Sequence, residues 1–240
     1  SFLPRSPDLL TLCFDRRTSS FERCNSDIIL SAMDPILLDG NSLTLADLTA
    51  AAEGRARFAL APAAREAMAA SRGLVDRCVD EGRTVYGITT GFGVFSEVSI
   101  SRDNVRKLQR NLILSHCAGV GEPHPVEVAR AMMLLRANAL AKGYSGIRIE
   151  VVETLLRLLA EDVVPVIPSQ GSVGASGDLA PLSHLAATLM GVGEVWDRGA
   201  RTQASDALAR LGVAAVTYEA KEGLAMINGT QAISAVGGLA

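Results

Sequence analysis

The tripeptide Ala175-Ser176-Gly177, within the glycine-rich residues 171–177, has the residue types from which a backbone can build its own electrophile. If the amide nitrogen of Gly177 reaches the carbonyl carbon of Ala175, a five-membered ring closes, and loss of water makes it an imidazolone. Loss of the Ser176 hydroxyl then leaves an exocyclic methylidene, which is strongly electrophilic. Gly177 has no Cβ that would block this approach. The tripeptide is therefore a candidate for a reactive group that needs no external cofactor.

The residues on either side of this loop argue against two simpler interpretations. Three glycines in seven residues are typical of a flexible surface turn. However, an apolar run at 163–168 precedes the loop, and Asp178 follows it as the expected N-cap of an apolar helix. A G-x-S-x-G nucleophile elbow would need glycine at position 178, where Asp178 stands. We therefore expect a loop held between a buried run and a buried helix.

Tyr86 is the candidate general base. Residues 84–86 are short and β-prone, and they lead into a glycine-rich turn at 87–93, so a phenol here can project into a cleft. The alternative is a packing residue whose hydroxyl bonds to a backbone carbonyl. The glycine turn also suggests a dinucleotide-binding loop, but Ser96 replaces the third glycine of that fingerprint. We expect the turn to fold over a substrate instead.

The histidines and one asparagine are the other candidates. His116 lies on the apolar side of its expected helix, four residues after Leu112, and we expect it to point inward as a core or pocket residue. Asn228 follows an apolar run, which is typical of an N-cap or turn residue. We interpret His184 as a core residue and His124 as a loop residue.

Helical periodicity covers most of the chain, so the predicted architecture is mainly α, with few and short strands. In the helix that begins at Pro62, the expected apolar face includes Ala67, Leu74 and Cys78. We expect helices at residues 44–54, 62–82, 102–117, 125–142, 148–160, 178–191, 205–211 and 224–240.

Composition excludes several classes of protein. The chain has 240 residues, 48% hydrophobic and 20% charged, with a formal net charge of -3. It has no cluster of Lys and Arg that would indicate nucleic-acid binding and no 18-residue uncharged apolar run that could span a bilayer. The cysteines have neither metal-ligand spacing nor the density of a disulfide scaffold. We expect no metal site, and reduced thiols in a cytoplasmic protein, at Cys13, Cys24, Cys78 and Cys117.

Five stretches together resemble the aromatic amino acid ammonia-lyase family, and most closely its histidine-specific branch. They occur in the family's order, at residues 86–93, 111–116, 141–146, 174–184 and 222–231. The resemblance covers about residues 33–240. It implies the helical ammonia-lyase (fumarase/aspartase-like) fold and a 4-methylidene-imidazol-5-one (MIO) group formed from Ala175, Ser176 and Gly177.

The resemblance also implies roles for single residues and an activity. Tyr86 matches the catalytic tyrosine, His116 a residue that contacts the substrate side chain, and Asn228 a residue beside the electrophile. His116 favours histidine or tyrosine over phenylalanine as the substrate, and Gln231 favours histidine over tyrosine. The implied reaction removes ammonia from L-histidine and gives urocanate, in a homotetramer. The alternatives are a tyrosine ammonia-lyase or aminomutase, or a truncated chain that only associates with full-length subunits.

The length departs from the family's pattern, because family members run about twice as far. We expect residues 1–32 to be a disordered extension outside the family, with translation starting at Met33. Residues 33–240 are expected to form the N-terminal domain and the start of the central helical domain. The chain would then stop within the central helical bundle, before the family's carboxylate-binding residues.

Overall fold

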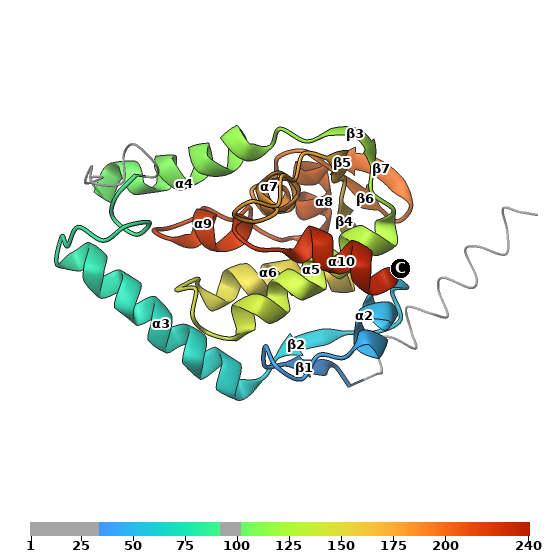
Figure 1. Cartoon of the computed structure of the whole chain (residues 1–240), viewed down its shortest axis with the longest axis horizontal. Helices are drawn as coiled ribbons and strands as arrows, with labels where there is room; N and C mark the ends of the chain where they lie inside the picture. Colours follow the sequence, from blue (N-terminus) through green and yellow to red (C-terminus); the bar gives the residue numbers. More distant parts are fainter. Residues whose placement is uncertain (1–33, 92–101) are drawn as a thin grey trace, which may run out of the picture. The chain divides into compact units, whose positions relative to one another are not determined.

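The computed structural model describes residues 34–91 and 102–240, and Pro35–Ala240 form one compact unit. Helices dominate this part of the chain (Figure 1), which confirms the mainly α architecture. The elements are, in order, β1 (Ile36–Leu38), α2 (Leu45–Ala52), β2 (Phe58–Leu60), α3 (Pro62–Asp80), α4 (Arg102–His116), β3 (Val120–Pro123), α5 (Val126–Ala141), α6 (Ile149–Ala160), β4 (Val163–Pro165), β5 (Pro168–Gln170), α7 (Leu179–Leu189), β6 (Glu194–Asp197), β7 (Ala200–Gln203), α8 (Ala204–Leu211), α9 (Glu222–Ile227) and α10 (Gln231–Leu239).

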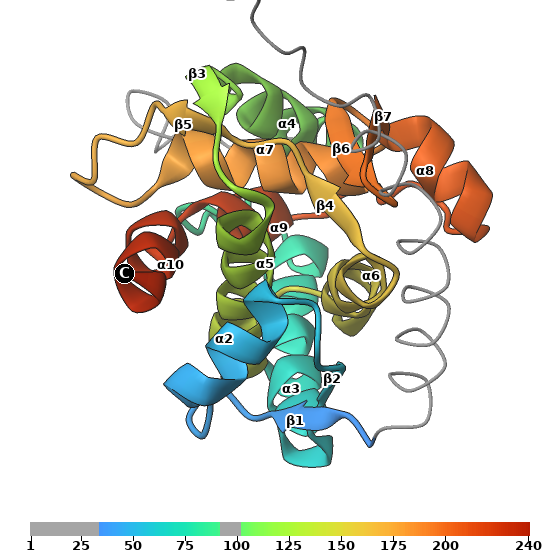
Figure 2. The ribbon, with the colours of Figure 1, turned by 90° about the vertical axis from the view of Figure 1, so that its right-hand side faces the viewer.

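Helix α5 lies at the centre of the core. Figure 2 shows it between α10 and α6, and it also packs against α2 and α3. A helix that is apolar on nearly every side is stable only when every side is covered. Its buried apolar residues are Ala129, Ala131, Met132, Met133, Leu134, Ala137, Leu140 and Ala141.

Helices α4, α7 and α9 pack on one another and form a second group beside α5. The strands are short and belong to small sheets. β1 pairs with β2 in parallel, β3 with β5 antiparallel, and β6 lies between β4 and β7 in an antiparallel sheet. The pairing of β3 with β5 matters for the site, because β5 leads directly into the glycine-rich loop before α7.

Most of the predicted helices are present, including the first one with its cap. Thr44 Oγ1 accepts the backbone N–H of Asp47 at 3.2 Å, and Asp47 Oδ2 accepts the N–H of Thr44 at 2.9 Å. This reciprocal pair is a capping box. The predicted apolar face of α3 was only partly right, because Ala67 and Leu74 are exposed. The buried stripe consists of Ala64, Met68, Val75 and Cys78.

Two other predictions about elements were wrong. Residues 84–86 form no strand, because the chain enters a hydrogen-bonded turn at Tyr86. The helix predicted at 224–240 is two helices, α9 and α10, separated by residues 228–230. Asn228 ends α9 with extended backbone angles, φ −92° and ψ 102°. The Asn-Gly pair at this point is a turn signal that outweighs the continuous apolar pattern.

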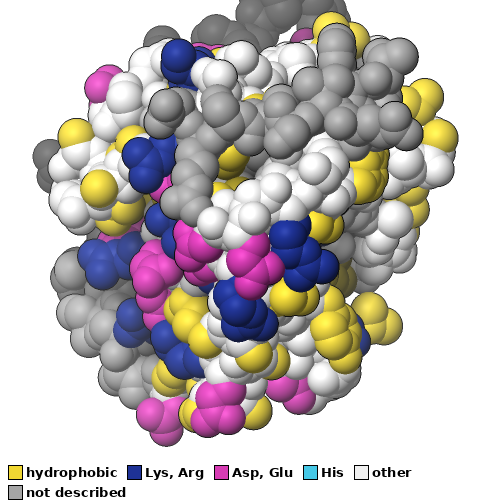
Figure 3. All heavy atoms as spheres, turned by 90° about the vertical axis from the view of Figure 1, so that its left-hand side faces the viewer, with side chains coloured by type: hydrophobic (Ala, Val, Ile, Leu, Met, Phe, Trp, Pro, Cys, Tyr) yellow, Lys and Arg dark blue, Asp and Glu magenta, His cyan; other side chains and the backbone are white. Residues whose placement is uncertain are grey.

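Some predictions fall on residues that lie outside the described part of the chain. They concern residues 1–32, Cys13, Cys24 and the end of the glycine-rich turn around Ser96. Within residues 34–91 and 102–240, no helix is long and apolar enough to cross a membrane. On the face drawn in Figure 3, basic and acidic side chains are interspersed rather than segregated.

Candidate active site

The loop between β5 and α7 carries the predicted reactive tripeptide at its surface. Ala175 and Ser176 lie in an exposed bend, whereas Gly177 is buried. Gly177 has a φ of 137°, a backbone angle that residues with a Cβ rarely adopt. Figure 2 shows the loop projecting beyond the strand and the helix that it joins. The tripeptide thus has one end anchored and the other end open to solvent.

The anchored end of the loop rests against the turn between α9 and α10. A Cβ built on Gly177 would lie 2.9 Å from the carbonyl oxygen of Gly229 and 3.2 Å from Asn228 Oδ1. The N–H of Asp178 donates to the same Gly229 oxygen at 2.6 Å. A side chain at position 177 would therefore displace this turn. The structure brings Gly177 and Asn228 together from positions 51 residues apart.

Asp178 occupies the N-cap position of α7, but its side chain does not cap that helix as the sequence predicted. The carboxylate is fully buried. Its Oδ2 accepts the N–H of Ile233 in the first turn of α10 at 3.0 Å, and its Oδ1 accepts the Ser172 hydroxyl at 2.5 Å. Asp178 therefore caps a neighbouring helix and ties the start of the loop to its end. Spacing along the sequence cannot reveal such a long-range cap.

Arg136 lies behind the α9–α10 turn and was missed by sequence reasoning. It projects from α5 and is only 4% exposed. Its Nη1 donates to the carbonyl oxygen of Asn228 at 3.1 Å and to Gln231 Oε1 at 2.9 Å, and its Nη2 donates to the carbonyl oxygen of Ala225. The available signal was a single charged residue within an otherwise apolar stretch of helix.

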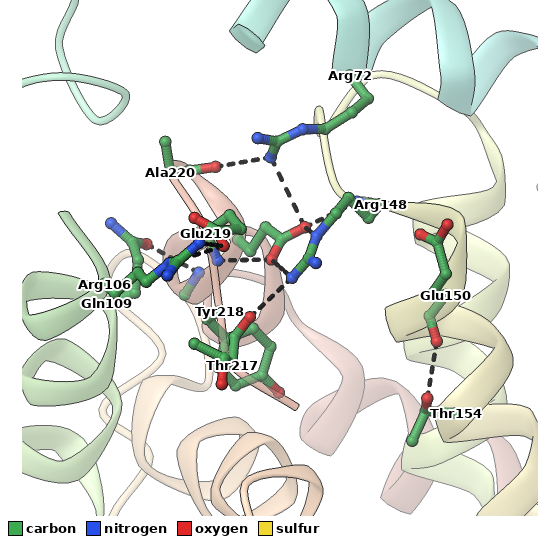
Figure 4. Close-up of polar contacts among 12 residues, drawn as sticks. Arg72, Arg106, Gln109, Arg148, Glu150, Thr154, Thr217, Tyr218, Glu219 and Ala220 are labelled. Atoms are coloured by element: carbon green, nitrogen blue, oxygen red, sulfur yellow. Dashed lines mark hydrogen bonds and ion pairs between the residues drawn. The ribbon is translucent and has the colours of Figure 1, made fainter. Parts of the chain in front are cut away.

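The start of α9 is anchored by a buried ion-pair network (Figure 4). The Glu222 carboxylate is fully buried and accepts hydrogen bonds from Arg148 Nε and Nη2, both at 2.7 Å. Arg72 Nη1 lies 3.6 Å from Glu222 Oε1. The Glu222 carboxylate raises the pKa of Arg148 above its ordinary value, chiefly through these hydrogen bonds. The network fixes one end of α9, and the Asn228 turn fixes the other.

Tyr86 lies in a turn that two threonine side chains hold. The Thr89 hydroxyl accepts the N–H of Val85 at 2.9 Å, and the Thr90 hydroxyl accepts the N–H of Gly87 at 3.3 Å. Both threonines are buried, while the Tyr86 side chain is 61% exposed. The turn therefore presents the phenol outward on a rigid base. Its apolar residues pack with α3 and α4, in a cluster separate from the main core.

His116 ends α4 and is half-buried rather than fully inward as predicted. Its Nδ1 lies 2.8 Å from the carbonyl oxygen of Leu112, so Nδ1 carries a proton and donates it to that oxygen. The fully buried face of α4 is formed by Val105, Gln109 and Ile113. Gln109 belongs to this face because its Oε1 accepts the N–H of Gly223 at 2.9 Å.

His184 connects α7 to the segment that follows His116. Its Nε2 accepts the N–H of Gly119 at 3.2 Å, so the ring is neutral with the proton on Nδ1. Burial lowers the pKa of His184 below its ordinary value of 6.5. The residue is half-buried and not the full core residue that we predicted. His124 lies in a loop after β3, as predicted.

These contacts join some of the predicted site residues and leave others apart. Gly177 meets Asn228, and a Cβ built on Gly171 would lie 3.1 Å from Gly119 Cα, which brings the segment after His116 to the start of the loop. The Tyr86 turn belongs to a different cluster. Two surface hollows of about 330 and 490 Å³ are lined by none of the predicted site residues. Among described residues, Cys78 and Cys117 are free thiols, and burial raises the pKa of Cys117 to about 11.

Comparison with known proteins relates this arrangement to a family. The sequence model of a family described as aromatic amino acid lyase matches residues 43–240. A histidine ammonia-lyase of Caldanaerobacter subterraneus subsp. tengcongensis is 52% identical over 205 residues, which cover 85% of this chain and 40% of that protein. The chain therefore spans about 40% of the length of such relatives.

Solved structures give the same result at the level of the fold. The histidine ammonia-lyase from Trypanosoma cruzi has a TM-score of 0.80 at 44% identity, over 86% of this chain and 40% of that one. A tyrosine aminomutase from Streptomyces globisporus has a TM-score of 0.80 at 37% identity, over 86% and 39% of the two chains. The fold is therefore the helical lyase fold, and the chain belongs to the aromatic amino acid lyase family.

Proposed function

We propose that this chain is part of an ammonia-lyase that converts L-histidine to urocanate and ammonia. The observation that carries the proposal is the contact of Gly177 with the Asn228–Gly229 turn, because it holds the candidate tripeptide against a side-chain amide. The identity to histidine ammonia-lyases supports the substrate. Residues 33–240 would be the lyase part of the chain, and residues 1–32 an extension outside it.

The residues at 175–177 fit a self-formed MIO group. Gly177 N would bond to the carbonyl carbon of Ala175, and the first water would carry away that carbonyl oxygen with the amide hydrogens of Gly177 and Ser176. The second water would take the Ser176 hydroxyl and its Cα hydrogen. No oxidant is needed. The close contact of Gly177 with Gly229 and Asn228, which leaves no space for a Cβ, supports this assignment. The finished group would supply an electrophile for the amino group of the substrate.

The other residues would act on protons and on orientation. Tyr86, presented outward by its threonine-held turn, would remove the β-hydrogen of the substrate as general base. His116 would accept a hydrogen bond from the imidazole N–H of the substrate at its Nε2, since its Nδ1 is already bonded. Asn228 Oδ1 and the adjacent amide would lie beside the tripeptide, where the side chain can orient the ring oxygen or the substrate carboxylate.

The remaining parts of the proposal concern assembly and location. The apolar residues on either side of Tyr86 pack with α3 and α4, whereas Gly177 contacts the α9–α10 turn. The α10 residues Ile233 and Val236 are exposed apolar side chains. We infer a homotetramer in which several chains complete each active site. Free thiols at Cys78 and Cys117 support a cytoplasmic location.

A second candidate is a tyrosine ammonia-lyase or aminomutase, which the similarity to the tyrosine aminomutase from Streptomyces globisporus favours. The test is to supply the full-length protein separately with L-histidine, L-tyrosine and L-phenylalanine and to follow the unsaturated acid and any β-amino acid formed. We expect L-histidine to give the highest kcat/KM. A pocket that hydrogen-bonds imidazole rejects an apolar ring, because unpaired buried polar groups cost about 1–3 kcal/mol each. A higher kcat/KM for L-tyrosine would overturn the assignment.

A further inference from the structure

The guanidinium of Arg136 is buried at an energetic cost that packing alone does not explain. Burial lowers its pKa to about 10, so the group stays charged at neutral pH. Within the described residues its hydrogen-bond acceptors are all neutral oxygens, and its Nε has no hydrogen-bond partner. An apolar side chain of similar volume would cover α5 without this desolvation penalty. The hydrogen bonds of the guanidinium, rather than its packing, are therefore the feature that needs an explanation.

The hydrogen bonds of Arg136 all go to one short segment of chain. The acceptors are the carbonyl oxygens of Ala225 and Asn228 and the side chain of Gln231, which come from the end of α9 and the start of α10. A planar guanidinium donates in fixed directions, so these bonds determine the path of the turn as well as its position. Arg136 therefore holds the α9–α10 turn from its α5 side.

The α9–α10 turn that Arg136 holds is in contact with the tripeptide at Gly177. A Cβ built on Gly229 would lie 2.2 Å from Arg136 Nη1, so the Gly229 backbone rests directly on the guanidinium. The amide nitrogen and carbonyl oxygen of the same residue would lie 3.0 and 2.9 Å from a Cβ on Gly177. Arg136, Gly229 and Gly177 are therefore packed in direct succession, with no side chain between them.

We propose that Arg136 is a positioning residue. It holds the Asn228–Gly229 turn against Gly177 in the geometry that ring closure at 175–177 requires, and it orients the Asn228 side chain toward the ring that forms. This inference rests on the proposed function. Ring closure requires the Gly177 nitrogen to come within bonding distance of the Ala175 carbonyl carbon. Small displacements of the Asn228–Gly229 turn that contacts Gly177 therefore slow ring closure. Arg136 donates to Ala225, Asn228 and Gln231, and none of these hydrogen bonds goes to residues 175–177.

The test compares variants of the full-length protein in two ways. Ring closure is followed by mass spectrometry of the peptide that holds residues 175–177, at set times after cell-free synthesis. The kcat is measured per ring-closed site, and thermal unfolding is recorded alongside. For Arg136→Gln we expect ring closure and kcat to fall by about 10- to 100-fold. Arg136→Lys, which keeps the charge but loses the planar fork, should recover part of both.

Two further variants make the result specific. Arg130→Gln removes another α5 arginine, which donates to the Ala52 carbonyl oxygen and to Asp162, and should leave ring closure at the wild-type rate. Gly229→Ala places a methyl group 2.2 Å from both Arg136 Nη1 and Gln231 Oε1, which disturbs the hydrogen bond between these two atoms, and should slow ring closure as Arg136→Gln does. If Arg136→Gln does not fold, Arg136→Lys and Gly229→Ala still decide the question.

The outcomes separate this inference from the proposed function. If wild-type protein closes the ring and folded Arg136 variants close it at the same rate with unchanged kcat per site, Arg136 contributes only to stability and the inference is wrong. The inference is also wrong if Gly229→Ala closes the ring at the wild-type rate. If the wild-type protein never closes the ring, the proposed function itself fails.

Discussion

Among single residues, Tyr86 gives a direct prediction about the proton-transfer step. Tyr86→Phe removes the proton acceptor but keeps the ring, so we expect kcat to fall about 100- to 10,000-fold with little change in KM. Steady-state kinetics of the full-length protein with L-histidine measures both. Tyr144→Phe, at a tyrosine that is 87% exposed, is the matched control. Near-normal turnover of Tyr86→Phe would return Tyr86 to a packing role.

The residues that support the site were harder to predict than those proposed to react. The residue types at 175–177 predicted a backbone-derived electrophile, and the structure places Gly177 against Asn228. Asp178 and Arg136 act through contacts with segments far away in the sequence, so no local pattern could assign them. The half-burial of His116 could not be predicted either. The helical period of α4 fits a face through Leu112 and His116 nearly as well as the face through Ile113 that is buried.

At the level of helices and strands, the presence of most helices could be predicted because apolar residues recur with the helical period on the face that becomes buried. The starts of α2 and α3 follow from a capping box and from Pro62 at the first helical position. The helix predicted at 224–240 ran across the break between α9 and α10 because apolar residues continue on both sides of it, although Asn228 was correctly predicted as an N-cap or turn residue. Contacts with distant residues hold α9 at both ends, through Arg148 at Glu222 and through Arg136 at Ala225 and Asn228.

The Glu222 network gives a prediction about stability. Glu222→Ala leaves Arg148 and Arg72 without their buried partner, so we expect the free energy of unfolding to fall by about 3–5 kcal/mol. The control is Glu153→Ala, which breaks an exposed ion pair with Arg65 and should cost at most about 1 kcal/mol. Chemical denaturation measures both. Equal effects of the two variants would show that the network does not hold α9.

His184 gives a prediction about pH. Its pKa is lowered in the folded protein, so the unfolded chain binds a proton more readily. The contribution of neutral His184 is therefore complete above its ordinary pKa of 6.5 and is lost as the pH falls through the folded-state pKa. We expect His184→Gln to lose less stability than the wild type between about pH 7.5 and pH 5. Parallel losses in thermal unfolding would contradict this.

For the whole molecule, the family and the helical fold could be predicted because ordered motifs encode both. The sequence did not predict how Tyr86 and residues 175–177 are placed relative to one another. The apolar residues on either side of Tyr86 pack with α3 and α4, Gly177 contacts the α9–α10 turn, and the chain spans about 40% of the length of its relatives. Packing between chains depends on surfaces whose partners no local pattern specifies.

The central claim is that residues 175–177 form the electrophile, and peptide mass spectrometry of the full-length protein tests it most directly. We expect the peptide that holds Ala175, Ser176 and Gly177 to be lighter than its sequence mass by two water molecules. The Ser176→Ala variant lacks the hydroxyl and cannot lose the second water. A wild-type peptide that keeps its full sequence mass in protein that converts L-histidine to urocanate would contradict the account.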